Sequence, residues 1–325
     1  MRKAGLFLFI FISLSAKAQL SGCTDAMAKN YNPTAVLNDG SCVYENTKIT
    51  PVFSITLSDT LNETSGLVYY DKQLWSHNDD TDTHIYALDT LGKITNRYPL
   101  KGVKNNDWEE LSQDSAYFYM GNFGNNVSGI RNDLHILRIE KNSLKANDPQ
   151  IDTIAFQYSN QIEFIRAKAN TTDFDCEAFI VGKDSIYIFT KQWTSKKTAL
   201  YALPKQPGNH TAQFKSELDT NGLITGATYL EDKKLIALCG YSKQLKPFVY
   251  LLYDYKENDF FSGNKRKINL ALPYHQVEGI ATQNGLQYYI SNEYFRLKPI
   301  INTPQQLHLL DLNTLLQLYL NKENH

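Results

Sequence analysis

Three glutamates occupy equivalent positions in repeated segments of this 325-residue chain. Glu109, Glu177 and Glu278 each begin a short apolar segment, and Ser65 and Thr225 begin two further segments of the same kind. If these segments are the innermost strands of a ring-shaped fold, the three carboxylates surround one mouth of its channel. Carboxylates that lie so close together raise one another's pKa unless a cation or a hydrogen-bond donor lies among them. We therefore predict a hard cation bound by the three glutamates or, alternatively, carboxylates that accept backbone N–H bonds from neighbouring repeats.

Polar and aromatic side chains follow a second strand-like segment in each repeat. The loops that carry them should open at the same mouth as the glutamates, where a ligand commonly binds. The candidate ligand-binding residues are His77, Asn78, Asp79, Asn122, Asn125, Lys191, Trp193, Tyr241, Glu293 and Tyr294. The rings offer stacking faces and Lys191 an anion contact, so a sugar, an aromatic compound or a phosphate would suit the site. The alternative is a set of ordinary polar hairpin turns.

The sequence assigns no catalytic residue. Ser65, His77 and Asp79 can be arranged as a triad on paper, but the G-x-S-x-G elbow that would position such a serine does not occur in the sequence. Whether the protein is an enzyme therefore stays open.

Five repeated units position these residues. Each unit contains short apolar segments separated by Asn, Asp and Gly turns, the pattern of a four-stranded antiparallel meander. The units begin roughly 45 to 70 residues apart, near the period of a propeller blade. The sequence therefore predicts an all-β fold, a β-propeller of five blades, or of six if residues 161–173 hide extra strands.

The N-terminal segment should close this ring. The fifth unit has three strands, whereas residues 51–57 have strand character and precede the first unit. We predict that they pair beside the third strand of the last blade, which leaves no open joint between the first and last blades.

The first 18 residues have the pattern of a secretory signal peptide. Arg2 and Lys3 precede an apolar run that ends in the small-x-small site Ala16-Lys17-Ala18. The run is shorter than the ~20 apolar residues of a membrane span, and no transmembrane segment is predicted. We expect an exported protein, periplasmic or extracellular, for which Ca²⁺ is favoured over Mg²⁺. Leu20-Ser21-Gly22-Cys23 allows lipoprotein processing at Cys23 as the alternative.

The balance of charges and the positions of the cysteines further limit the class of protein. The 33 Lys and Arg residues nearly balance 34 Asp and Glu, which excludes a polybasic nucleic-acid binder. Cys23 and Cys42 most simply form a disulfide that closes a small module over residues 19–46, and the propeller domain then occupies 47–325. Cys176 and Cys239 either pair or remain buried thiols.

Two parts of the chain resemble known families. Residues 22–44, with GCTD, NYNP and NDGSCVY, resemble a short cysteine module of secreted Bacteroidetes proteins, which implies an exported accessory module. The segments ETSGL, NDWEE, GNFGNN and VEGIA, in this order over about 50–312, resemble a family of secreted bacterial β-propellers of undefined activity. That family is similar to the SdiA-regulated and esterase-like phytase propellers.

These observations together predict the function. We expect an exported β-propeller that binds a small molecule or a cell-surface partner at its channel mouth, without established catalysis. The alternative is a calcium-dependent hydrolase of phosphoesters or lactones.

Overall fold

The computed structural model describes residues 20–322, and the predicted signal peptide lies outside the described residues. The fold is almost entirely β, with two α-helices, α1 (Lys141–Lys145) and α2 (Asn313–Lys322), and two 3₁₀ turns, Asp59–Leu61 and Glu231–Lys233. Within residues 20–322, no helix is long and apolar enough to cross a membrane.

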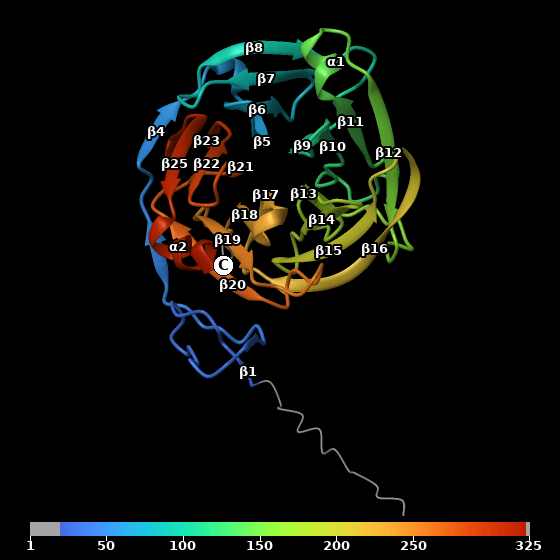
Figure 1. Ribbon diagram of the computed structural model, residues 1–325. Coiled ribbons are helices and arrows are strands. Elements are labelled where there is room, and N and C mark those ends of the chain that lie inside the picture. The colour runs from blue at the N-terminus through green and yellow to red at the C-terminus, as the bar shows by residue number, and fades with distance from the viewer. Residues whose placement is uncertain (1–19, 323–325) are drawn as a thin grey trace, which may run out of the picture.

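Most strands belong to five groups of four, each hydrogen-bonded in a row (Figure 1). The first group is β5 (Thr64–Tyr70), β6 (Gln73–Asn78), β7 (His84–Leu88) and β8 (Ile94–Pro99). The second is β9 (Trp108–Gln113), β10 (Tyr117–Asn122), β11 (His135–Glu140) and β12 (Ile151–Tyr158). The third is β13 (Asp175–Val181), β14 (Ser185–Lys191), β15 (Lys197–Pro204) and β16 (Gly208–Asp219). The fourth is β17 (Leu223–Leu230), β18 (Leu235–Tyr241), β19 (Pro247–Tyr253) and β20 (Asn264–Leu270).

The fifth group contains the closing strand predicted from the sequence. It consists of β21 (Val277–Thr282), β22 (Gln287–Asn292), β25 (Gln306–Asp311) and β4 (Phe53–Thr56). Strand β4 pairs antiparallel with β25, with Phe53 opposite Leu309 and Thr56 opposite Gln306. The N-terminal strand therefore lies beside the third strand of the last group, as predicted for residues 51–57.

The innermost strands contact one another in a closed cycle. Each of β5, β9, β13, β17 and β21 touches the next, and β21 returns to β5. Five apolar clusters fill the spaces between neighbouring groups; one contains the Trp75 and Phe118 rings, whose centroids are 5.0 Å apart. Strand β13 is buried along its whole length because it is covered on both sides, whereas outer strand β16 is mostly exposed.

Two outer-edge pairings were not predicted. Strand β12 pairs in parallel with β16, which joins the second and third groups into one eight-stranded sheet. Strand β3 (Thr47–Ile49) adds in parallel to β20. Residues 161–173 form a loop without a strand, and a separate hairpin, β23 (Phe295–Leu297) and β24 (Ile301–Thr303), projects from the fifth group.

The N-terminal module contains the predicted disulfide. Cys23 and Cys42 are bonded, which occupies the sulfur that lipoprotein processing would modify. Two short strands, β1 (Ser21–Gly22) and β2 (Leu37–Asn38), pair in parallel inside it. The other two cysteines, Cys176 and Cys239, are buried free thiols.

The module packs directly on the fourth group. The Asp25 carboxylate accepts hydrogen bonds from the Tyr253 and Tyr44 hydroxyls at 2.6 and 2.8 Å. The Asn38 amide donates to Asp254 Oδ2 at 2.8 Å and to Asn264 Oδ1 at 3.0 Å. The module is therefore attached by buried polar contacts and by strand β3.

Candidate functional site

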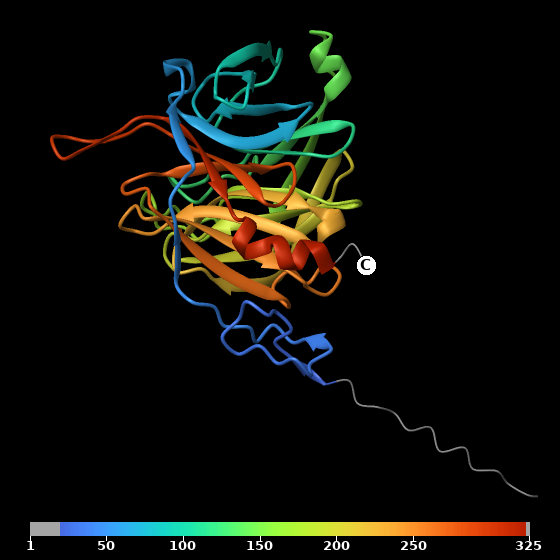
Figure 2. The same ribbon diagram turned by 60° about the vertical axis from the view of Figure 1, so that its left-hand side comes forward.

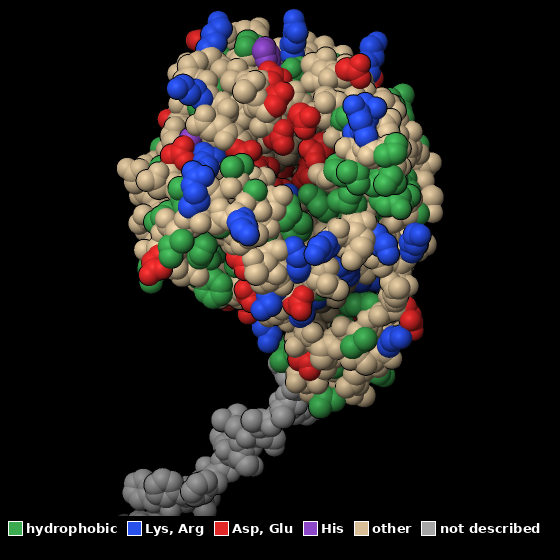
Figure 3. All heavy atoms as spheres, turned by 180° about the vertical axis from the view of Figure 1, so that it is seen from behind, with side chains coloured by type: hydrophobic (Ala, Val, Ile, Leu, Met, Phe, Trp, Pro, Cys, Tyr) green, Lys and Arg blue, Asp and Glu red, His purple; other side chains and the backbone are tan. Residues whose placement is uncertain are grey.

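A cavity of about 790 Å³ lies where the innermost strands begin. Its walls come from all five strand groups, and its volume is within the range of small-molecule sites. The view from behind shows acidic side chains gathered in a hollow on this face (Figure 3). Six carboxyl groups line the cavity: Asp79, Asp107, Glu109, Glu177, Glu278 and Glu293.

The structure brings most of the sequence-predicted site residues to this cavity. All three predicted metal-binding glutamates line it, together with five predicted ligand-binding residues, Asp79, Lys191, Trp193, Tyr241 and Glu293. Among residues 20–322, however, Glu109, Glu177 and Glu278 do not form a group whose oxygens all lie within 4.8 Å of one another, so the structure does not bring the predicted metal ligands together. The remaining five, His77, Asn78, Asn122, Asn125 and Tyr294, are not among its lining residues.

His77 and Asn78 are buried inside the first group, which corrects their predicted placement. His77 Nδ1 lies 3.0 Å from the Asn78 carbonyl, and burial lowers the pKa of this imidazole to about 4. The Asn78 amide donates to the Thr60 carbonyl at 2.9 Å and to Asp82 Oδ2 at 3.1 Å. The Asn78 amide therefore ties strand β6 to the turn at Thr60, whereas the His77 ring packs edge-on against the Trp108 ring of the second group.

The other three residues also make internal contacts. The Asn122 amide donates to the Lys104 carbonyl and the Asn125 amide to the Phe174 carbonyl, each at 3.1 Å. The Tyr294 hydroxyl donates to Asn302 Oδ1 at 2.8 Å within the projecting hairpin. Their amide and hydroxyl groups position the walls of the cavity.

A β-bulge at the start of each innermost strand explains why the glutamates face the channel. In the pairing of β13 with β14, Cys176 and Ala178 lie opposite consecutive residues, so Glu177 is the extra residue. Glu109 and Glu278 occupy the same place in their pairings, as does Thr225. Because a bulge turns its extra residue out of the regular alternation, these side chains point into the channel mouth.

Glu177 has a dedicated partner. Its carboxylate forms a buried ion pair with Lys191 Nζ, which also lies 4.9 Å from the centroid of the Trp193 ring and 5.4 Å from that of Tyr241. Burial raises the pKa of Glu177 to about 8 against the opposing effect of Lys191. Burial alone would lower the pKa of Lys191, but Glu177 and other surrounding groups raise it above its ordinary value.

Glu278 has no such partner. Its side chain is only 6% exposed, and it forms no hydrogen bond or ion pair with any residue between 20 and 322. Burial raises the pKa of Glu278 well above its ordinary value, and Lys191 opposes this. The Glu278 carboxyl group faces the cavity, where water or a ligand can supply its hydrogen bonds.

Sequence reasoning missed Asp107, which has a strained backbone. Its φ is +128°, a conformation that L-residues rarely adopt. Asn105 Oδ1 holds the turn by accepting the N–H groups of Asp107 and Trp108 at 3.1 and 2.9 Å. Burial raises the pKa of Asp107 to about 6, and the charge of Asp175 contributes.

Gly124 fits tightly against this carboxyl group. A Cβ atom at Gly124 would lie 2.1 Å from Glu109 Oε1 and 2.2 Å from Asp107 Oδ2. The GNFGNN segment therefore needs a glycine here to let the two carboxyl groups share one corner of the cavity.

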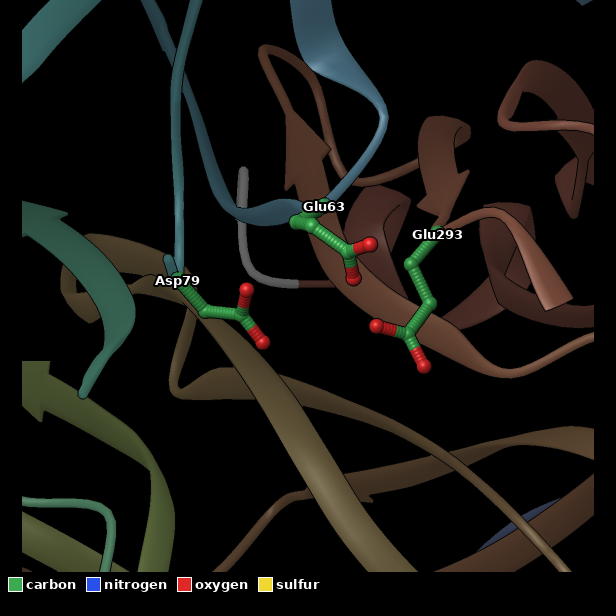
Figure 4. A group of neighbouring side chains, drawn as sticks. All are labelled: Glu63, Asp79 and Glu293. Carbon is green, nitrogen blue, oxygen red and sulfur yellow. The ribbon is translucent and has the colours of Figure 1, made fainter. Parts of the chain in front are cut away.

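A second group of carboxylates lies at the outer mouth. Glu63, Asp79 and Glu293 offer oxygens that all lie within 4.8 Å of one another, and the three side chains point toward one another (Figure 4). Burial, followed by the charge of Glu63, raises the pKa of Asp79 to about 7. The Gln276 amide donates to Glu293. Glu63 lies two residues before Ser65, where the first repeated unit begins. Alignment of the first residues of the five units therefore did not select it.

Glu110 has the structural role that was the alternative for the three glutamates, namely accepting backbone N–H bonds from another repeat. This fully buried carboxyl group accepts the Leu111 N–H at 2.9 Å and the Ala227 N–H at 2.6 Å, and so connects β9 with β17 across the ring. Burial raises its pKa well above the ordinary value. Glu109 and Glu110 are adjacent, but the first faces the cavity and the second joins strands.

Comparison with known proteins gives no direct assignment. No protein-family model matches the chain, and no curated protein matches it significantly.

Proposed function

We propose that the chain is an exported five-bladed β-propeller that binds its ligand in the acidic channel mouth through a divalent cation, Ca²⁺ being favoured. The observation that carries the proposal is the convergence of Glu63, Asp79 and Glu293, whose carboxylate oxygens lie within 4.8 Å of one another beside a cavity lined by six carboxyl groups. The closed cycle of innermost strands and the five four-stranded groups support the propeller assignment. The predicted signal sequence and the Cys23–Cys42 disulfide support export.

The donor atoms suit a hard cation. Carboxylate oxygens are the ligands that Ca²⁺ prefers, and it tolerates six to eight of them in irregular geometry. Glu63, Asp79 and Glu293 already converge from the first and fifth groups. A cation among them would relieve the mutual repulsion that raises the pKa of Asp79 and of Glu293.

The opposite wall suits an oxygen-rich ligand. Trp193, Lys196 and Lys243 line the side of the cavity formed by the third and fourth groups. A sugar hydroxyl or a phosphate oxygen could complete the coordination of the cation while the rest of the ligand contacts these side chains. This placement favours binding of an anionic or polyhydroxylated small molecule.

Calorimetric titration of chelator-treated protein with CaCl₂ and MgCl₂ tests the proposal. We expect saturable Ca²⁺ binding that is tighter than Mg²⁺ binding, and a higher melting temperature with Ca²⁺. Glu293→Gln should weaken the affinity at least about tenfold, because it removes a charged ligand. The exposed Glu217→Gln is the matched control. Unchanged melting temperature and no heat of binding with either cation would exclude the cation.

One observation favours the hydrolase alternative. Asp107 combines a strained backbone with a pKa of about 6, as a general base in a cavity would need. Hydrolysis of aryl phosphates and lactones should be measured with Ca²⁺ and with chelator. Calcium-dependent turnover that Asp107→Asn abolishes would establish an enzyme, whereas cation binding without turnover would leave a binding protein.

A further inference from the structure

Two protrusions beside the acidic cavity carry exposed aliphatic side chains. In the β23–β24 hairpin, Leu297 is 52% and Ile300 is 79% exposed. In the loop 161–173, Ile162 is 87% and Ile165 is 72% exposed. Single exposed apolar residues are ordinary on protein surfaces, but two pairs on loops that both border one cavity indicate a contact surface.

Both protrusions border the same opening. Phe295 at the base of the hairpin and Asn170 near the end of the loop line the cavity. The Tyr294 N–H donates to the Asn62 carbonyl and the Asn170 N–H to the Asn126 carbonyl, each at 2.8 Å, which fixes the two bases. Figure 2 shows the hairpin projecting well beyond the strands of the ring. The two protrusions therefore rise from the rim of the cavity.

Each protrusion also carries two exposed cationic side chains. Arg296 and Lys298 flank Leu297, and Arg166 and Lys168 follow Ile165. None of the four forms an ion pair with a carboxylate between residues 20 and 322. Their positive charge is therefore free to meet an anionic surface.

We infer that this face docks on an anionic lipid surface. The aliphatic tips would enter the boundary between headgroups and acyl chains, and the four cationic groups would contact lipid phosphates, the combination that interfacial binding requires. A protein partner fits less well, because Lys is depleted at the centres of protein interfaces. The cavity carboxylates lie in a hollow of this face (Figure 3) and can remain hydrated.

Sedimentation with vesicles tests this inference. The full mature chain is mixed with vesicles of phosphatidylcholine alone or of equal phosphatidylcholine and phosphatidylglycerol, in a buffer containing a chelator. We expect binding to the anionic vesicles only, weakened by added salt. The double variant Leu297→Ser, Ile300→Ser should lower the partition coefficient at least about tenfold. Arg296→Gln with Lys298→Gln should act similarly, since each charge contributes near the surface.

The matched control removes exposed leucines elsewhere. Leu91, in the β7–β8 turn, and Leu318, on α2, are 59% and 53% exposed and belong to neither protrusion nor to the lining of the cavity. Leu91→Ser with Leu318→Ser should leave vesicle binding unchanged. Absence of binding to anionic vesicles, or equal loss in the control, would overturn the inference and point to a protein partner. Because calcium is absent, this outcome is independent of the proposed cation site.

Discussion

Raising the pH in the absence of divalent cations should destabilise the protein. Burial and neighbouring charges raise the pKa of Asp79 from an ordinary 3.8 to about 7 and that of Asp107 to about 6. Below pH 3.8 both the folded and the unfolded chain hold the Asp79 proton. Between pH 3.8 and 7 the folded chain binds more protons than the unfolded chain, so the free energy of unfolding falls as the pH rises.

The magnitude follows from the size of the pKa difference. A difference of about three units at Asp79 corresponds to about 4 kcal/mol, lost between pH 4 and pH 7. Asp107 titrates in the same range, and its charge contributes to the pKa of Asp79, so the two effects are not additive. A loss of about 4 kcal/mol is a large part of the stability of an ordinary domain.

Urea unfolding followed by tryptophan fluorescence measures this dependence. Trp75 and Trp108 are fully buried, so their emission reports the folded ring. With chelator, the free energy of unfolding should fall from pH 5 to pH 8, and saturating CaCl₂ should remove most of the fall by stabilising the ionised carboxylates. Asp79→Asn should flatten the curve without calcium. Stability that is constant or rises over this range in chelator would refute the reasoning.

Three further changes test the buried polar groups. Lys191→Met should lower the free energy of unfolding at pH 8 by about 3 to 5 kcal/mol, and adding Glu177→Gln should recover much of it; no recovery would argue against the ion pair. Glu110→Ala should cost about 3 kcal/mol in urea unfolding because two buried N–H groups lose their acceptor, and a cost below about 1 kcal/mol would contradict this role. Replacing Cys23 and Cys42 by Ser should lower the melting temperature, since an ~20-residue loop contributes about 3 kcal/mol when closed; an unchanged melting temperature would show that docking alone holds the module.

The sequence predicted the strand order well because the signals are local. Apolar segments separated by Asn, Asp and Gly turns identified the members of each meander, and the three-stranded fifth unit identified 51–57 as its missing strand. The parallel pairing of β12 with β16 could not be predicted, because it depends on how the outer edges approach in space. The docking of Asp25 on Tyr253 likewise depends on contacts between distant parts of the chain.

The site was predicted only in part, and the bulges explain the difference. Alignment of the unit starts selected Glu109, Glu177 and Glu278 because each is the extra residue at one level of the ring. The prediction that whole loops line the mouth failed for His77 and Asn78, because both residues lie within strand β6 and are buried by the packing around it. The ion pair of Glu177 and the free carboxyl of Glu278 depend on side-chain geometry that spacing does not reveal.

The buried carboxyl groups of this cavity lower the stability of the folded protein, which argues that the cavity has a function. Among residues 20–322, Lys191 opposes the raised pKa of Asp79, of Glu278 and of Glu293. Replacing buried ionic groups by apolar side chains of similar size often stabilises a protein, so selection for stability alone would not maintain such an excess of buried carboxyl groups. Glu110 shows that one carboxyl group suffices to join the strands. A cation bound there, as proposed, would offset the repulsion among the remaining carboxyl groups at the mouth.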